Sequence, residues 1–266
     1  MSGSAPFTAI VVTYNEAARL RACLESLAFC RQLLVVDLGS SDDCVAIAQS
    51  CGAQVLRHAR VPVVEQVRAF AVAHARHDWL LFMDPDEVIL PALARQLQEV
   101  VIGRADAGSV EVPWQFYFRG KALHCCVWGQ PGYSKQVLFH RERVELRPLV
   151  HRGYRLLEGF RAVTVERSGE NYIQHYWIDS YHELFAKHRR YLSQEGSSRY
   201  AAGQRFSWGR LALYTVGALK MHLIDYDGWR CGFTGVFLSL FHGWYMCRSW
   251  LALRAYQRSR REAAPA

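Results

Sequence analysis

Three carboxylates stand within four consecutive positions directly after an apolar run in the first third of the chain. The run covers residues 79–83, and Asp84, Asp86 and Glu87 follow it. Carboxylate oxygens are the ligands that Mg²⁺ and Mn²⁺ prefer, and such ions commonly bridge to the phosphate groups of a substrate. The same residues could instead cap the helix expected from Pro91, because Asp accepts hydrogen bonds from the free amides of a first helical turn. On these residues alone, both interpretations are open.

Short apolar runs alternate with amphipathic segments on both sides of this stretch. Strands are expected at residues 7–13, 33–36, 53–56 and 79–83, and helices at about 20–27, 44–51, 65–76 and from 91. Four strand–helix repeats with short connections predict a parallel sheet with right-handed crossovers. Ligands bind beyond the carboxyl ends of the strands in such sheets. Residues 13–16, Asp37 and the carboxylates after residue 83 should therefore meet at one edge.

The composition of the 266 residues limits the class of protein. The chain has 51% hydrophobic and 21% charged residues, which is typical of a globular fold with one domain and elaborations. The net charge of +8 indicates an anionic partner: nucleotide phosphates, acidic lipid or nucleic acid. No nucleic-acid reader motif occurs, and neither a dinucleotide fingerprint nor a P-loop is present. Phosphate binding is therefore expected from a metal, basic side chains and helix amides.

The eight cysteines are expected to be reduced thiols. Residues 1–6 lack the basic and apolar regions of a secretory signal, which favours a reducing cytosol. Two pairs spaced seven apart, 23/30 and 44/51, are interpreted as core packing, and no zinc-finger spacing is found.

The first hundred residues resemble a family 2 glycosyltransferase of the GT-A type. The matching motifs are Val-Val-Thr-Tyr-Asn-Glu (11–16), Val-Val-Asp-Leu-Gly-Ser-Ser-Asp-Asp (35–43), Gln-Val-Arg (66–68) and Asp-Pro-Asp-Glu (84–87). The resemblance implies an α/β fold: a Rossmann-like mixed sheet with mainly parallel strands flanked by helices, here with a C-terminal helical extension. It also favours a ligand site over a helix cap for the carboxylates.

The resemblance implies roles for individual residues. Asp86 would bind the divalent metal, Mg²⁺ or Mn²⁺, and Asp84 would lie near the ribose or sugar as a catalytic residue. The residues implied to bind the nucleotide, with Asp37 accepting hydrogen bonds from a base such as uracil and Arg68 approaching the diphosphate, are Thr13, Tyr14, Glu16, Asp37, Gln66, Arg68 and Asp84. The metal and Arg68 would stabilise the charge of the leaving diphosphate.

The general base that an inverting transfer needs is less evident. The subgroup that this chain resembles tends to place acids in the segments aligned with 131–139 and after residue 151, where this chain has no carboxylate. His151 is the predicted catalytic base, with His124 as an alternative, because imidazole titrates near neutral pH. A structural role is the alternative for either histidine, and Glu111 could be a solvated strand residue.

The second half resembles the bacterial lipopolysaccharide inner-core glucosyltransferases more weakly, through His-Tyr-Trp (175–177) and Asp-Gly-Trp-Arg (227–230). Residues 108–118 are expected to form a strand, and residues 181–200 a basic helix. Aromatic residues here could stack on sugars or fill an aromatic core; they are Trp114, Tyr117, Trp128 and Tyr133.

An uncharged segment, residues 231–247, lies near the end of the chain. It is short for a membrane span, but it has an apolar stripe and a basic tail that ends near Arg261. This combination predicts a helix in a membrane interface beside anionic headgroups. Packing on the domain or on a dimer partner is the alternative.

These observations predict a nucleotide-sugar and acceptor domain at 1–178 and a helical, basic, membrane-associating extension at 179–266. The expected function is metal-dependent inverting transfer of a sugar, from a UDP-sugar, to a cell-envelope glycan or lipid-linked acceptor. The expected location is the cytoplasm, peripheral on the inner face of the membrane through residues 229–261. A catalytically silent nucleotide-sugar-binding protein is the alternative. A nucleotidyltransferase would need a Gly-rich basic loop after the first strand, which residues 14–20 do not supply.

Overall fold

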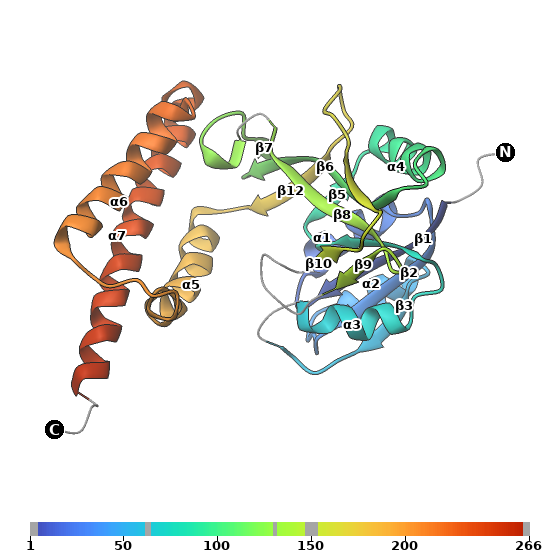
Figure 1. Cartoon of the computed structure of the whole chain (residues 1–266), viewed down its shortest axis with the longest axis horizontal. Helices are drawn as coiled ribbons and strands as arrows, with labels where there is room; N and C mark the ends of the chain where they lie inside the picture. The colour runs from blue at the N-terminus through green and yellow to red at the C-terminus, as the bar shows by residue number, and fades with distance from the viewer. Residues whose placement is uncertain (1–4, 62–64, 130–131, 147–153, 263–266) are drawn as a thin grey trace. The chain divides into compact units, whose positions relative to one another are not determined.

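The computed structural model describes residues 5–61, 65–129, 132–146 and 154–262 (Figure 1). The chain divides into two compact units. The first contains Met1–Gln115 and Gly132–His175, and the second contains Phe116–Pro131 and Tyr176–Ala266. The functional division after residue 178, into a catalytic domain and a membrane-associating extension, stays a prediction.

Alternating strands and helices form the first part of the first unit. The strands are β1 (Ala5–Thr13), β2 (Cys30–Asp37), β3 (Gln54–Arg57) and β4 (Trp79–Met83), and the helices are α1 (Ala17–Ser26), α2 (Cys44–Ser50), α3 (Glu65–Ala73) and α4 (Pro91–Gly103). These strands are hydrogen-bonded neighbours in the order β3-β2-β1-β4, and every pair is parallel. All eight elements lie where the sequence predicts them.

Hydrophobic patterning explains these elements. All five side chains of β4 are buried, as expected for a strand covered on both faces. The buried face of α1 consists of Leu20, Cys23 and Leu24, which recur at helical spacing.

The strand register places the predicted site at one edge. Thr13 of β1 lies beside Asp37 of β2, and Val11 lies beside Met83 of β4. Asp84 follows Met83, so the polar residues after all three strands leave the sheet at nearly the same level.

Antiparallel strands complete the sheet, which continues in the order β4-β8-β6-β12-β5. The remaining strands are β5 (Glu87–Ile89), β6 (Ala107–Phe118), β7 (Lys121–Ala122), β8 (Ser134–His140), β9 (Val144–Leu146), β10 (Tyr154–Leu156), β11 (Arg161–Thr164) and β12 (Ile173–Ile178). β8 pairs antiparallel with β4 and β6, whereas β11 pairs parallel with β6. β9 and β10 form a separate antiparallel pair. The mixed α/β fold class is therefore confirmed.

The second unit is mainly helical. Its elements include α5 (Tyr181–Ala201), α6 (Trp208–Lys220), α7 (Gly232–Glu262) and the short turns η1 (Val127–Gly129), η2 (Met221–Asp225) and η3 (Gly228–Cys231). Ser180 and Ser207 cap α5 and α6, each accepting a hydrogen bond from an amide of the first turn. The predicted helical extension is confirmed.

Helix α7 is longer than the uncharged segment 231–247 suggests. Its 31 residues continue through the basic tail. Phe237 and Phe241 pack on Tyr181 and Phe185 of α5, with ring centroids 4.6 and 5.1 Å apart. The side of α7 that carries Phe233, Val236, Leu240 and Trp244 is exposed. Part of the apolar stripe therefore packs inside the unit and part faces solvent.

None of the helices in the described parts of the chain combines the length and the apolar character that crossing a membrane requires.

The expectation of eight reduced thiols is wrong for one pair. Cys125 and Cys231, both in the second unit, form a disulfide with Cα atoms 6.1 Å apart. Their separation of 106 residues explains why spacing along the chain did not indicate the bond. The interpretation of the other pairs as packing holds for Cys23, Cys30 and Cys44, which are buried, whereas Cys51 is half-buried.

Two histidines in the second unit are uncharged: His222 is buried and His242 is half-buried. The rings of His222 and His242 stack with centroids 4.1 Å apart, and Trp128 contacts both. Burial lowers the pKa of His222 to about 3, with a further contribution from His242, and lowers the pKa of His242 to about 4. Both imidazoles are therefore neutral at pH 7.

Candidate nucleotide-sugar and metal site

The three carboxylates after β4 form a closed turn, which we call the acidic turn (residues 84–87). The Asp84 amide donates to Glu87 Oε2 at 2.9 Å, and the Glu87 amide donates to the Asp84 carbonyl at 3.0 Å. Helix α4 begins beyond this turn with Leu90 as its N-cap and no side-chain capping bond. The helix-cap interpretation of Asp84 and Asp86 is therefore wrong.

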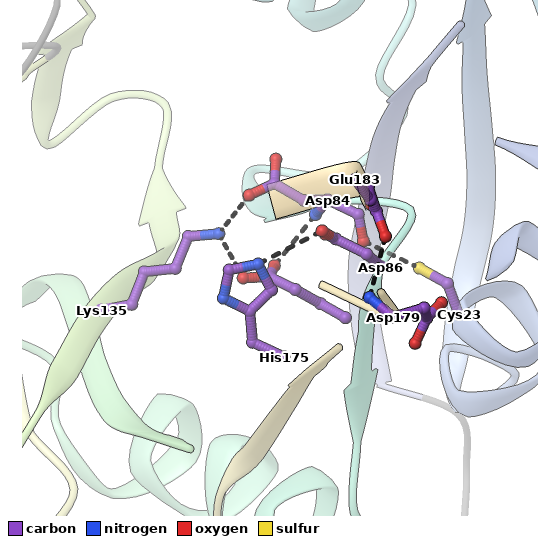
Figure 2. Close-up of polar contacts among 8 residues, drawn as sticks. Cys23, Asp84, Asp86, Lys135, His175, Asp179 and Glu183 are labelled. Atoms are coloured by element: carbon purple, nitrogen blue, oxygen red, sulfur yellow. Dashed lines mark hydrogen bonds and ion pairs between the residues drawn. The ribbon is translucent and has the colours of Figure 1, made fainter. Parts of the chain in front are cut away.

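A lysine from β8 holds two of these carboxylates. Lys135 Nζ donates to Asp84 Oδ2 at 2.7 Å and to Glu87 Oε1 at 2.6 Å, as Figure 2 shows for Asp84. Burial would lower the pKa of Lys135, but the two carboxylates outweigh it and raise that pKa above its ordinary value. Desolvation would likewise raise the pKa of Asp84, yet Lys135 lowers it. Lys135 is therefore a fixed positive charge in the turn.

At Glu87 and the neighbouring Cys23, unlike at Lys135 and Asp84, burial determines the direction of the pKa shift. The Glu87 side chain is fully buried, and burial raises its pKa although Lys135 opposes the shift. Burial also raises the pKa of Cys23, and the carboxylates add to this. The Cys23 thiol therefore stays protonated and donates to the Asp84 carbonyl at 3.4 Å (Figure 2).

Asp86 points to a different partner. Its Oδ2 lies 3.2 Å from Nε2 of His175 on β12 (Figure 2). The His175 ring stacks on the indole of Trp114 from β6, with centroids 4.5 Å apart and planes 5° from parallel. The Lys135 ammonium lies 5.0 Å from the centroid of the same indole. Trp114 thus contacts both Lys135 and His175, the two side chains that reach the acidic turn.

Asp86 provides a carboxylate oxygen, the kind of ligand that Mn²⁺ and Mg²⁺ prefer, and His175 provides a nitrogen, which Mg²⁺ binds less readily. Within the described ranges, no group of three or more His, Cys, Asp or Glu side chains could hold a metal ion. Asp86 and His175 would therefore be two protein ligands, and the other ligands of an ion held there would have to come from bound substrate or water. Such an ion would supply positive charge to the leaving group.

The ends of β1 and β2 form a second polar cluster beside the acidic turn. The Asp37 carboxylate is buried and accepts hydrogen bonds from the amides of Gly39 at 3.2 Å and Ser40 at 3.1 Å. Gly39 has φ +86°, a conformation that favours glycine. A cavity of about 350 Å³ opens here, lined by Asp37, Gly39, Ser40, Val45, Arg57, His58 and Ala59.

The structure places the other predicted nucleotide-binding residues around these strand ends. Thr13 is buried, with its hydroxyl 3.3 Å from Cys44 Sγ, and the amide of Glu16 donates to the same sulfur at 3.2 Å. The guanidinium of Arg60 lies 4.2 Å from the centroid of the Tyr14 ring.

Helix α3 carries the two remaining residues that were predicted to bind the nucleotide, Gln66 and Arg68. The backbone of Gln66 is helical, and its side chain is outside the described part of the structure. Arg68 lies with its guanidinium 5.1 Å from the centroid of the Phe82 ring on β4, and its charge contributes to lowering the pKa of Asp84. Its Nε is buried without a hydrogen-bond partner in the described structure.

The predicted base cannot be placed in this site. His151 lies outside the described residues. The alternative His124 is an exposed residue of the second unit. Glu111, interpreted as a solvated residue, accepts a hydrogen bond from the Ser134 hydroxyl and is half-buried.

The candidate sugar-stacking rings all have aromatic neighbours. Trp114 lies against His175 and Tyr133, which supports the aromatic-core interpretation for both rings. In the second unit, Tyr117 contacts Tyr176, and Trp128 contacts Trp177 with centroids 4.6 Å apart.

Sequence reasoning missed the two partners of the acidic turn. Lys135 lies in the segment 131–139, where the resemblance predicts an acid and this chain has none, and this departure was the available signal. His175 opens the His-Tyr-Trp motif, which indicated a subgroup but not a partner for Asp86.

The family model for Glycosyl transferase family 2 matches residues 8–142, which is half of the chain and includes the acidic turn and Lys135. This protein therefore belongs to glycosyl transferase family 2. It is a glycosyltransferase with a GT-A fold, and it acts on a nucleotide sugar.

Relatives of the chain carry consistent names. The lipopolysaccharide core biosynthesis glycosyltransferase LpsC of Rhizobium meliloti is 26% identical, over 98% of this chain and 95% of that protein. An uncharacterized glycosyltransferase of Rickettsia felis is 36% identical over 35% of this chain, which corresponds to 32% of its own length.

The similarity of this chain to solved structures is weaker than its similarity to these relatives. Glucosyl-3-phosphoglycerate synthase from Mycobacterium tuberculosis, in complex with Mn²⁺, UDP and phosphoglyceric acid, is 19% identical over 51% of this chain and 56% of that chain, with a TM-score of 0.38. This chain thus spans about half of that enzyme's length, and the likeness supports nothing about the ligands of this chain.

Proposed function

We propose that the protein transfers a sugar from a UDP-sugar, with inversion, to a glycan or lipid-linked acceptor of the cell envelope. The observation that carries the proposal is the acidic turn at the carboxyl end of β4, where Asp86 lies beside His175. Thr13 and Asp37 end the two neighbouring parallel strands at the same level. Ligands of open α/β sheets bind at this kind of edge.

The cavity beside Asp37 is the proposed site for the base. Its volume of about 350 Å³ is within the usual size of a small-ligand pocket, and it contains the exposed edge of the turn at Gly39 and Ser40. The Asp37 carboxylate has further lone pairs after accepting from these two amides, so it can also accept an N–H of uracil.

Charges around the acidic turn suit the leaving group. Asp86 and His175 would hold a divalent cation, which supplies charge to the diphosphate when bound. Arg68 of α3 has a buried Nε with no hydrogen-bond partner in the described structure. Its guanidinium would bind a diphosphate oxygen. Asp84 keeps one carboxylate oxygen for the ribose or sugar, because Lys135 contacts the other. His151 stays the proposed base.

The proposed acceptor is part of a lipopolysaccharide core. Its support is the relative LpsC, which is similar over nearly the full length of both chains and is named for lipopolysaccharide core biosynthesis. Transfer reactions that contain the purified donor and lipopolysaccharide truncated at successive core positions would identify the accepting residue.

We also propose that the second unit attaches to a membrane surface through residues 229–261. Phe233, Leu240 and Trp244 recur at helical spacing on the exposed side of α7, with Phe233 75% exposed. Further along this helix, arginines line three neighbouring cavities; they are Arg248, Arg254, Arg258, Arg260 and Arg261. Exposed apolar residues followed by arginines suit acyl chains and headgroup phosphates of an anionic bilayer.

Flotation with vesicles tests this attachment. The protein should float with phosphatidylglycerol-containing vesicles and less with pure phosphatidylcholine, and Phe233→Ser with Leu240→Ser should reduce flotation in both cases. Arg258→Gln with Arg261→Gln should remove only the preference for anionic lipid. Flotation that neither pair of substitutions affects would exclude this surface.

The proposed location is the cytoplasm, peripheral on the inner face of the membrane. Cytosolic reductants keep most thiols free, so the Cys125–Cys231 bond gives a direct check of the compartment. Cells are quenched with acid, and the protein is unfolded and alkylated without reductant, because Cys125 is buried in the folded protein. Mass spectrometry should then find both cysteines modified, and the bond open, if the protein is cytoplasmic. Protection of both cysteines would argue for an oxidising compartment.

Calorimetric titration with UDP and GDP, with and without Mn²⁺, tests the donor site. We expect UDP binding that depends on Mn²⁺ and is abolished in Asp86→Ala. Binding of neither nucleotide, or binding indifferent to both the metal and Asp86, would exclude the proposed donor site. Tight UDP binding without turnover of any UDP-sugar would instead favour a catalytically silent binding protein.

A further inference from the structure

The acidic turn contains three carboxylates, whereas the proposed cation site uses only one of them, Asp86. Asp84, Asp86 and Glu87 would all compete for a cation, because they lie within four residues. The structure separates them into two sets: Asp84 and Glu87 are bonded to Lys135, whereas Asp86 lies beside His175. This separation is the observation that carries the inference.

We propose that Lys135 is a positioning residue that withholds Asp84 and Glu87 from the cation and leaves Asp86 with His175 to bind it. The inference rests on the function proposed above, since it concerns the same cation. Lys135 acts through the carboxylates and does not itself contact the donor.

The contacts of Lys135 are suited to this role. Its ammonium joins Glu87 Oε1, while Glu87 Oε2 accepts the amide of Asp84, so one lysine fixes both ends of the turn. Glu87 is fully buried and the Lys135 side chain is 21% exposed, so water screens the pair weakly. Lys135 also lies over the Trp114 indole, which limits the positions that its long side chain can take.

Without the lysine, Asp84 and Glu87 would form a competing site that binds a cation more tightly. An ammonium 2.6–2.7 Å from two carboxylate oxygens repels a divalent ion that approaches the same oxygens. Removing the ammonium would leave Asp84 Oδ2 and Glu87 Oε1, which lie 2.7 and 2.6 Å from its position, open to a bare ion. The ion would then bind away from His175 and from the diphosphate position.

Lys135→Met tests the proposal, because it keeps the apolar stem and removes the charge. Binding of Mn²⁺ alone, measured by electron paramagnetic resonance without nucleotide, should become about tenfold tighter, because a repulsion of about 1.4 kcal/mol is removed. Mn²⁺-dependent UDP binding should weaken by a similar factor. A variant that merely fails to fold would lose both kinds of binding, so the opposite directions separate the two explanations.

Two further variants serve as controls. Lys187→Met removes a lysine of α5 outside the acidic turn and should leave Mn²⁺ binding unchanged. Lys135→Arg keeps the positive charge and should stay close to the wild type in Mn²⁺ affinity. Near-ultraviolet circular dichroism of each variant would report whether the fold is intact.

The outcomes distinguish this inference from the proposed function. If wild-type protein binds Mn²⁺ with UDP but Lys135→Met binds Mn²⁺ alone no more tightly, the role of Lys135 is overturned and the donor site stands. If neither protein binds Mn²⁺, with or without UDP, the cation site itself is overturned. If Lys135→Arg also gains Mn²⁺ affinity, the charge is not the cause and the positioning role is excluded.

Discussion

Two neighbouring turns at one sheet edge satisfy their carboxylates in different ways. The turn after β2 holds Asp37 with the amides of Gly39 and Ser40, which are neutral donors two and three residues away. The acidic turn after β4 holds Asp84 and Glu87 with the charged Lys135, which is 51 and 48 residues away. Hydrogen bonds to backbone amides form with the turn itself, whereas an ion pair with a distant lysine requires the whole sheet.

This difference indicates different roles. A carboxylate held by its own turn keeps a fixed direction and can offer free lone pairs to a neutral base. Carboxylates held by a lysine are partly neutralised, and the remaining charge is concentrated on Asp86, where a cation would bind. The variants below test the contrast between the Asp37 turn and the acidic turn.

The largest effect is expected from Asp86→Asn. If charge on this side chain stabilises the leaving diphosphate, kcat should fall by about 100-fold to 1,000-fold. Steady-state kinetics with a UDP-sugar measures this loss. The matched control is Asp78→Asn, which affects an exposed carboxylate paired with Arg141 and should leave kcat within about twofold. Equal effects of the two substitutions would remove the distinction between the acidic turn and an ordinary surface acid.

Glu87→Gln should mainly affect stability. Removing one member of a buried ion pair leaves the other without its partner, and we expect a loss of about 3 kcal/mol in the free energy of unfolding. Urea unfolding followed by tryptophan fluorescence measures it. Combining Glu87→Gln with Lys135→Met should cost less than the sum of the single variants, because the two residues contact each other. Additive losses would show that they are not coupled.

The histidine pair in the second unit shows what burial does without an oppositely charged partner. Because the pKa values of His222 and His242 are lowered in the folded state, the unfolded chain binds more protons below pH 6.5. Their contribution to stability is present above pH 6.5 and is lost as pH falls, by about 1.4 kcal/mol for each histidine at pH 5.5. Thermal unfolding at pH 5.5 and pH 8 should show this difference, and His222→Leu should reduce it.

A smaller effect on stability is expected from Asp37→Asn. An amide oxygen can still accept from the Gly39 or Ser40 amide, so the cost should be about 1 kcal/mol or less. UDP affinity should nevertheless fall by about tenfold if Asp37 also accepts from the base. Calorimetry measures the affinity, and a loss of stability without a loss of affinity would assign Asp37 to the turn alone.

Local patterns were sufficient to predict the first half of the fold. Strand β4 consists of five consecutive buried residues, and the buried face of α1 recurs at helical spacing, so each element is defined within its own residues. The Asp37 turn was predictable for the same reason. The family resemblance then indicated which strand ends would form the site.

The partners of the acidic turn were not predictable in this way. Lys135 and His175 reach the turn through antiparallel strands β8 and β12, and the contact between His175 and Asp86 spans 89 residues. Nothing in the spacing of a lysine or a histidine specifies which strand end it will face. The same limit applies to Cys125 and Cys231, whose bond depends on how the second unit folds.

The Cys125–Cys231 bond also determines how the chain is connected covalently. Residues 132–175, which belong to the first unit, lie in sequence between two cysteines of the second unit. Strand β8 with Lys135, and His175 of β12, are therefore carried on a closed covalent ring. A single proteolytic cut between the two cysteines would open this ring without releasing a fragment. Such a cut protein would run as one full-length band on a non-reducing gel and as two bands after reduction.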